Sequence, residues 1–428
     1  MQVSMNSLVK RVGKSIVCFF LEHQVKKLRD KQDFKLIAVA GSVGKTSTKL
    51  AIAKTLSANS KVIYQEGNYN DRLTVPLVLF NKDIPSLVNI FAWIKIYVAN
   101  NKLIKSKYPY KYAVVELGTD RPGEIDRFAY LKPDIAVLTA IAEEHLEFFK
   151  TLDRVAKEEL TIFKYSNKVL VNIDDVPSKY LTDLSYTSYG LKKGADYSAE
   201  VNNEHTLSGS DLKILTPNKH LSIKTTVLGS QGKKLVIAAV ATSDLLGLRL
   251  EEINRGVKGI RSFSGRMKIL KGIKGSTIID DSYNASPIST KAGLDVLYAA
   301  KANKRIAVLG SMNELGKYSA EAHRSIGSYC LPDKLDIVVT IGSEAQKYLA
   351  PSAVKAGCHV KSFNNPNEAG EYVKDQIVDD TVVLVKGSQN GVFAEESIKP
   401  LLKNKDDQSL LVRQSKSWLD KKASQLIS

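Results

Sequence analysis

Cysteine is scarce in this 428-residue sequence. The three cysteines, Cys18, Cys330 and Cys358, lie far apart, and none belongs to a CxxC spacing. This pattern argues against a disulfide framework and against a cysteine-based zinc site. It indicates a reducing compartment, so we expect a cytoplasmic protein.

Long apolar runs are also missing. The longest one near the N-terminus, residues 16–21, is too short to span a bilayer, and no small-residue cleavage site follows it. We therefore expect neither a signal peptide nor a transmembrane helix. Aromatic RNA-binding motifs and zinc fingers are absent too, so the net charge of +17 indicates a solvated basic surface and no nucleic-acid partner.

The N-terminal segment is both basic and apolar. Across residues 7–31, apolar side chains recur at steps of three or four among lysines and arginines, which predicts an amphipathic helix. Such a helix can pack on the first domain or make a peripheral contact with a membrane, and the sequence leaves both open. A second apolar stretch, residues 84–98 with Trp93, could serve the same contact.

Strand-like and helix-like segments alternate over most of the chain. An apolar strand at residues 35–40 leads through a glycine turn into a helix from about residue 46 to residue 56. This alternation is typical of a parallel sheet wrapped by helices, an α/β fold. Three further strands are predicted at residues 112–117, 135–139 and 168–172, and the polar stretch 188–226 reads as appended antiparallel strands.

A second alternating series follows residue 261. It predicts a Rossmann-like C-terminal α/β domain with strands at residues 276–280, 305–309, 337–341 and 381–385. We therefore expect an N-terminal helix in residues 1–34, a central P-loop domain in residues 35–260 and a C-terminal domain in residues 261–428.

The strongest local signal is the run Gly41-Ser42-Val43-Gly44-Lys45-Thr46-Ser47. Its glycines let backbone N–H groups converge on phosphate oxygens, Lys45 neutralises phosphate charge, and the Thr46 hydroxyl can hold a magnesium ion. The full Walker A pattern has a further glycine where Val39 stands. The strand before the run and the helix after it still favour a phosphate-binding loop over an ordinary turn.

The chain resembles the Mur ligase family in a series of ordered blocks. The loop is similar to the family's TG[TS]NGKT form, and the other matching blocks follow in the family's order. They are Gly67-Asn68-Tyr69-Asn70, Glu116-Leu117-Gly118, His145-Leu146-Glu147, Gly265-Arg266-Met267, Asp280-Asp281-Ser282-Tyr283-Asn284-Ala285-Ser286-Pro287, Leu309-Gly310-Ser311-Met312-Asn313-Glu314-Leu315-Gly316 and Lys386-Gly387-Ser388.

The resemblance implies an ATP-dependent amide ligase that uses Mg²⁺ and makes an acyl-phosphate intermediate. The matching branch adds D-alanyl-D-alanine to a muramoyl-tripeptide precursor in peptidoglycan synthesis, so these small molecules are the expected substrates, and we expect a monomer. Two alternatives stay open: a related ligase for a different carboxylate, and a nucleotide-binding scaffold that has lost ligation.

The resemblance also implies roles for individual residues. Glu116 ends a predicted strand beside the loop, where a carboxylate suits magnesium, although a structural role is the alternative. His145 taken alone would read as a surface residue. Four residues are expected to be catalytic: Lys45, Glu116, His145 and Glu159. The expected metal ligands are Thr46, Glu116 and His145. The expected nucleotide contacts are Gly41 to Ser47, Arg266, Asp281 and Asn284, and the expected substrate contacts are Asn68, Asn70 and Lys386.

The sequence departs from the family at several of these places. Family members carry a carbamoylated lysine fourteen residues after the histidine, where this chain has Glu159. A glutamate already has the anionic oxygens that carbamoylation adds, so we predict that Glu159 replaces the modified lysine, with Lys157 as the competing assignment. Ser311 stands in place of an aspartate. Members of this branch also carry a UDP-recognising domain, which residues 1–34 are too short to form.

Overall fold

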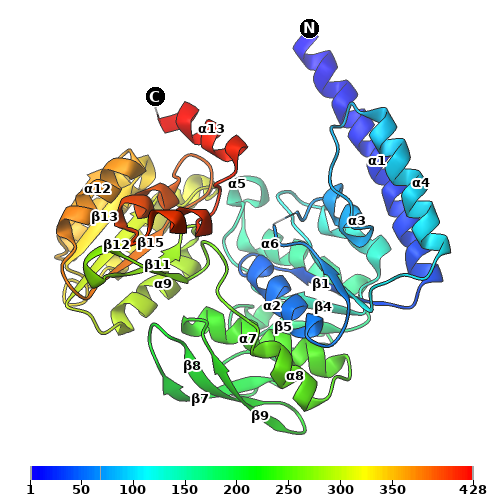
Figure 1. The fold of residues 1–428 in the computed structure, drawn as a ribbon, viewed down its shortest axis with the longest axis horizontal. Coiled ribbons are helices and arrows are strands. Elements are labelled where there is room, and N and C mark those ends of the chain that lie inside the picture. The colour runs from blue at the N-terminus through cyan, green and yellow to red at the C-terminus, as the bar shows by residue number, and fades with distance from the viewer. Residues whose placement is uncertain (1, 68, 427–428) are drawn as a thin grey trace.

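The computed structural model describes residues 2–67 and 69–426 of the chain. Two six-stranded sheets and one three-stranded sheet organise these residues, and helices cover both faces of the larger sheets (Figure 1). The α/β fold expected from the sequence is confirmed. Among the described helices, none is long and apolar enough to cross a membrane.

The first large sheet is parallel and has the strand order β2-β3-β1-β4-β5-β6. Its middle strands are short apolar runs because both of their faces are buried, as is usual in parallel sheets. The strands are β1 (Lys35–Ala40), β2 (Val62–Tyr64), β3 (Tyr112–Glu116), β4 (Ile135–Leu138), β5 (Val169–Asn172) and β6 (Thr187–Tyr189).

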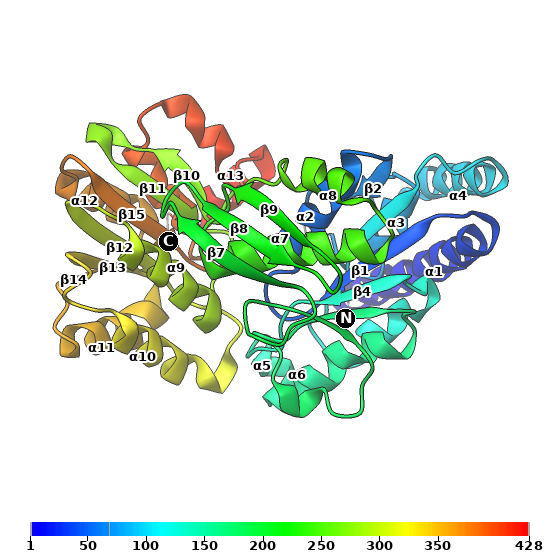
Figure 2. The same cartoon turned by 90° about the horizontal axis from the view of Figure 1, so that it is seen from below.

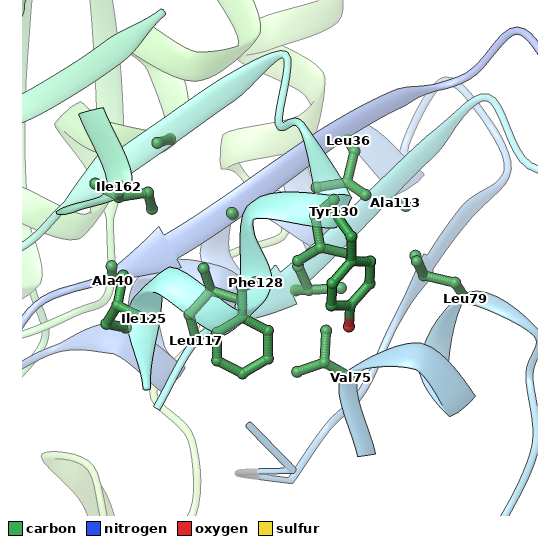
Figure 3. Close-up of a cluster of buried hydrophobic side chains, with 14 of the residues drawn as sticks. Leu36, Ala40, Val75, Leu79, Ala113, Leu117, Ile125, Phe128, Tyr130 and Ile162 are labelled. Atoms are coloured by element: carbon green, nitrogen blue, oxygen red, sulfur yellow. The ribbon is translucent and has the colours of Figure 1, made fainter. Parts of the chain in front are cut away.

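Helices bury a separate hydrophobic core on each face of this sheet. Leu36 and Ala40 of β1 point into one core, where Leu117 and Phe128 also pack (Figure 3). Ile37 points into the other core. The first face is covered by α1 (Gln2–Lys31), α3 (Thr74–Leu79), α4 (Ile90–Lys105) and α6 (Leu152–Glu159), and the second by α2 (Lys45–Ser57), α7 (Gly229–Leu245) and α8 (Leu250–Val257).

A small antiparallel sheet lies below α7 and α8 in Figure 1 and faces the viewer in Figure 2. Buried and partly exposed residues alternate along its middle strand, which identifies a half-buried sheet. Its inward side chains, among them Ile214 and Ile223, extend the second core of the parallel sheet. The strands are β7 (Ser198–Glu204), β8 (Ser210–Leu215) and β9 (His220–Thr225).

The second large sheet has the order β10-β11-β15-β12-β13-β14, and only β10 runs antiparallel to its neighbour. Its strands are β10 (Lys268–Lys271), β11 (Thr277–Asp281), β12 (Lys304–Gly310), β13 (Ile337–Ile341), β14 (Val360–Phe363) and β15 (Thr381–Lys386). Its helices are α9 (Pro287–Ala299), α10 (Ser319–Tyr329), α11 (Ala350–Lys355), α12 (Pro366–Gln376) and α13 (Lys416–Leu426).

Candidate active site

The phosphate loop connects β1 to α2 and requires glycine at two positions. Gly41 has φ 119° and Gly44 has φ 88°, values that favour glycine. A Cβ atom on Gly41 would lie 2.4 Å from Thr139 Oγ1 and 2.8 Å from the backbone nitrogen of Ala140, so the neighbouring strand end leaves no room for a side chain. The loop is therefore held tightly against the end of β4, and α2 begins directly after it at Lys45.

Lys45 begins α2 and lies among carboxylates. Its Nζ is 3.5 Å from Glu144 Oε2 and donates to the carbonyl oxygen of Ser42 at 3.2 Å. Burial alone would lower the pKa of Lys45, but Glu144, Glu159 and Glu116 raise it above its ordinary value. Lys45 is therefore a fixed positive charge at the mouth of the loop.

Glu116 stands at the end of β3 and is the hub of a buried polar cluster. Its Oε1 accepts hydrogen bonds from Thr46 Oγ1 at 3.1 Å and from Asn70 Nδ2 at 3.2 Å. Its Oε2 lies 3.3 Å from Lys49 Nζ, yet this buried oxygen has no hydrogen-bond partner among the described residues. A carboxylate with one buried oxygen that accepts no hydrogen bond, and with the Thr46 hydroxyl beside it, is suited to a hard divalent cation.

A cleft of about 440 Å³ opens in front of the loop, between the two large sheets. Lys45, Thr46, Asn70, Glu116 and His145 line it from the first sheet's side. From the other side it is lined by Arg266, Tyr283, Asn284, Ser286, Glu314, Gln389 and Asn390. Ligands bind at such carboxyl ends of parallel strands.

His145 joins the two walls of this cleft. Its Nδ1 lies 3.3 Å from Glu314 Oε2, across the gap between the sheets, and its Nε2 lies 3.5 Å from Glu144 Oε1 and from Asp120 Oδ1. Within the described residues no hydrogen bond or ion pair links His145 to Thr46 or to Glu116. Burial raises the pKa of Glu314 although His145 opposes that shift.

Two expected residues of the second sheet form an ion pair. Asp281 ends β11 and Lys386 ends β15, and the two residues are register partners in this parallel pair. Lys386 Nζ lies 2.6 Å from Asp281 Oδ2 and donates to the carbonyl oxygen of Asn284 at 3.0 Å. Burial lowers the pKa of Lys386, while Asp281 counteracts that effect.

A smaller cavity, of about 90 Å³, lies on the other side of the loop. Val43, Gly44 and Ser47 line it together with Asp281 and Lys386. The rest of its wall is largely apolar or aromatic and includes Tyr189, Val227, Leu228, Phe263 and Met267. Arg266 separates the two cavities: it lines both, its guanidinium lies 4.1 Å from the centre of the Tyr283 ring, and its Nε is buried without a described partner.

Glu159 lies behind the phosphate loop, at the end of α6. Its Oε2 accepts a hydrogen bond of 2.7 Å from the backbone nitrogen of Gly41. Burial raises its pKa to about 7, Lys45 lowers it and Glu144 adds to the rise. Glu159 does not belong to the residues that line the 440 Å³ cleft.

This raised pKa predicts that stability depends on pH through Glu159. The folded state keeps the carboxyl proton up to about pH 7, whereas the unfolded state releases it near its ordinary value of 4.5. The unfolding free energy should therefore fall as pH rises through this window, by up to about 3 kcal/mol. Denaturant titrations at about pH 5 and about pH 8 measure the fall, which Glu159→Gln should remove.

Glu251→Gln, a change of the same kind on the exposed face of α8, is the control for that measurement and should leave the fall intact. If Glu159→Gln and the wild type lost stability in parallel, Glu159 would not be the titrating group.

The structure brings most of the expected residues to the loop and its two cavities. Asn68 lies outside the described residues. Sequence reasoning assigned no role to Lys49, Glu144 or Glu314, although Glu314 stands in one of the matching blocks. Lys49 was open to detection, since it follows Lys45 by one helical turn, but the contact of Glu314 with His145 depends on how the two sheets face each other.

Three features of the site identify the class of protein. They are a glycine loop at a helix N-terminus, a lysine among carboxylates, and a charged cleft between two α/β units, and together they are typical of an enzyme that transfers phosphoryl groups from a nucleotide. The sequence matches the Mur ligase middle domain over residues 39–87 and 95–242. It also matches the glutamate ligase domain of the Mur ligases over residues 265–389.

Curated relatives and a solved structure agree with these matches. The UDP-N-acetylmuramoyl-tripeptide–D-alanyl-D-alanine ligase of Rickettsia prowazekii is 30% identical over 374 residues, which cover 84% of this chain and 77% of that protein. The enzyme of that name from Bacillus subtilis is 28% identical, over 90% of this chain and 79% of the relative.

The fold of MurF ligase from Thermotoga maritima, solved with ADP, superposes with a TM-score of 0.72 at 22% identity, over 92% of this chain and 84% of that one. The chain belongs to the Mur ligase family and is an ATP-dependent ligase that acts on small molecules.

Proposed function

We propose that this enzyme joins D-alanyl-D-alanine to the carboxylate of a UDP-muramoyl-tripeptide during peptidoglycan synthesis. The observation that carries the proposal is the position of Lys45 at the mouth of a phosphate loop that faces a cleft between two sheets. Relatives with this named activity match over more than three quarters of their length. The three free, buried cysteines support a cytoplasmic enzyme, and we expect it to work as a monomer.

The proposed reaction has two steps. A substrate carboxylate oxygen attacks the γ-phosphorus of ATP, the bond from that phosphorus to the bridging oxygen breaks, and ADP leaves. The amine of the dipeptide then attacks the acyl carbon, inorganic phosphate departs with its electron pair, and the amine loses a proton. The first step brings two anions together, and Lys45 reduces their repulsion and stabilises charge on the transferred group.

Thr46 and Glu116 fit a magnesium ion. Both offer hard oxygen donors, and Glu116 Oε2 is buried without a hydrogen bond among the described residues. When bound, the ion would add positive charge at the β- and γ-phosphates. His145 stays our candidate for a second metal, because it lines the same cleft and has carboxylates on both ring nitrogens.

Glu159 stays our candidate for the place of the carbamoylated lysine. Two contacts support this proposal. Glu159 accepts a hydrogen bond from the backbone nitrogen of Gly41 directly behind the loop, and the charge of Lys45 acts on its carboxyl group. In this position it would act by fixing the loop and tuning the charge around Lys45. We keep Lys157 as the alternative.

The residues of the second sheet would orient nucleotide and substrate. We propose that Arg266 and Asn284 contact the nucleotide phosphates, since both line the cleft in front of the loop. Asp281 and Lys386 line the smaller cavity, whose apolar and aromatic side chains beside the loop would contact the base of ATP. Lys386 was expected to contact substrate, and its ion pair with Asp281 favours a supporting role in that wall. Asn70 faces the cleft and stays a substrate contact.

The domain limits stay a proposal as well. We divide the chain into residues 1–34, 35–260 and 261–428, because the parallel sheet with its antiparallel extension ends before the β10–β15 sheet begins.

Phosphate release from ATP tests the proposed function. Purified enzyme receives UDP-muramoyl-tripeptide, D-alanyl-D-alanine, both or neither, and the product mass is then determined. We expect sustained phosphate release only with both substrates, and a product heavier by one dipeptide less one water. Release that ignores either substrate, or that occurs only with another acid, would contradict the assignment.

A further inference from the structure

Helices α1 and α4 pack side by side at the edge of the molecule (Figure 1). Two hydrogen bonds show that they run parallel. Gln24 Nε2 donates to the carbonyl oxygen of Tyr97 at 2.8 Å, and Gln32 Nε2, further along the chain, donates to that of Ile104 at 3.0 Å. Asn100 Nδ2 adds a buried bond to Gln24 Oε1 at 3.0 Å. These bonds fix the two helices to each other, and Val25 and Leu28 of α1 pack their inner side into the first core of the parallel sheet.

The outer side of this pair, together with the loop that leads into α4, is apolar and exposed. Segments 16–20 and 84–98 carry 11 of the 21 exposed large hydrophobic side chains in the described part of the chain. Phe91 is 79% exposed, Val88 72% and Phe19 64%. The rings of Phe20 and Tyr97 meet edge to face at 5.9 Å, which joins the two segments. We call this surface the α1–α4 apolar face.

The two exposed stripes become basic toward their C-terminal ends. On α4 the stripe continues from Phe91 into Lys102 and Lys105, roughly 16 Å further along the axis at the rise of an α-helix. Residues 84–111 contain no acidic residue. On α1 the stripe continues into three exposed lysines, Lys26, Lys27 and Lys31, beside one exposed acid, Asp30. Because the helices are parallel, both groups of lysines gather at the same end.

We propose that the α1–α4 apolar face docks on an anionic lipid membrane. Apolar side chains of an interfacial helix enter the boundary between headgroups and acyl chains, and neighbouring lysines bind anionic headgroups. A second copy of the chain is a poorer partner, since Asp30 is the one exposed acid that the described side chains of its α1 and α4 offer to these lysines. The described helices cannot span a bilayer, so the contact is peripheral.

Docking would bring the candidate active site close to the lipid surface. Lys14 and Cys18 of α1 line a cavity of about 390 Å³ that shares Asn70, Gly118 and Asp120 with the cleft in front of the phosphate loop. The helix that contacts lipid on its outer side therefore forms a wall of the substrate entrance on another side.

Vesicle co-sedimentation of the full-length enzyme, without ATP or substrates, tests this inference independently of the proposed function. The vesicles are phosphatidylcholine alone or phosphatidylcholine with phosphatidylglycerol. We expect binding to the anionic vesicles only, weakened by salt. The double variant F19S/F91S should bind at least roughly tenfold more weakly, because it lacks two large apolar side chains that the wild type transfers from water into the membrane. K102Q/K105Q should weaken binding by removing charge alone.

Matched variants on the second sheet's side are the controls. V354S/V378S removes two exposed apolar side chains, and K355Q/K361Q removes two exposed lysines, so both should bind as the wild type does. Unchanged melting temperatures and unchanged ligation in solution would show that F19S/F91S is folded. Equal binding by F19S/F91S and the wild type, or no binding by the wild type, would overturn the inference. A dimer that F19S/F91S abolishes would assign the face to a second copy instead.

Discussion

Lys45→Ala should reduce ATP-dependent ligation by about a thousandfold or more. The side chain carries the fixed positive charge at the mouth of the loop, and its pKa is raised by Glu144, Glu159 and Glu116, so it stays protonated through the working pH range. Without it, the nearby carboxylates of Glu144 and Glu116 would repel both ATP and the substrate carboxylate. Steady-state phosphate release with both substrates measures the loss.

Lys54→Ala is the matched control for this variant. Lys54 lies on the same helix with an exposed side chain, and its charge lies over the Tyr64 ring at 5.7 Å, away from the cleft. It should retain nearly all activity. Should Lys45→Ala keep more than about a tenth of the wild-type rate, charge neutralisation by Lys45 could not be the main contribution to catalysis.

Lys49→Met should lower the free energy of unfolding by about 3–5 kcal/mol. Lys49 is buried with its Nζ 3.3 Å from Glu116 Oε2 and bonded to the carbonyl oxygen of Gly67 at 2.6 Å. Burial lowers the pKa of Lys49, and Glu116 counteracts that effect, so the pair holds its charges by mutual attraction. Removing the lysine leaves an uncompensated carboxylate in the interior. Denaturant titration at neutral pH measures the change.

A double-mutant cycle separates this pair from general loss of packing. The variant Lys49→Met/Glu116→Gln should be less destabilised than the sum of its two single variants, because it removes both charges together. Strict additivity would show that the 3.3 Å approach of the two groups contributes nothing to stability.

The sequence was sufficient for the elements that follow strong local rules. The phosphate loop was predicted because glycine, lysine and threonine at fixed spacing follow an apolar strand, and the buried strands were predicted because they are continuous apolar runs. The predicted strand at residues 337–341 coincides with β13, and the predicted helix at 46–56 lies within α2. The short strands β2, β10 and β14 were missed, since partly exposed strands of three or four residues give almost no periodic signal.

Contacts between distant segments were beyond the sequence. Asp281 and Lys386 each stood in a recognised block, but their ion pair depends on the register of β11 with β15. The approach of Glu314 to His145 depends on how the two sheets face each other. Residues 7–31 left packing and membrane contact open. The structure shows that the helix packs through Leu21 and Val25 while exposing Phe19.

Isotope transfer from the substrate carboxylate to phosphate is the most direct test of the account. The muramoyl-tripeptide is labelled with a heavy oxygen isotope in its reacting carboxylate, and the phosphate released during ligation is analysed by mass spectrometry. Attack of the carboxylate on the γ-phosphorus beside Lys45 predicts that each released phosphate carries one carboxylate oxygen. Released phosphate free of the label, with the peptide product still formed, would contradict the acyl-phosphate mechanism.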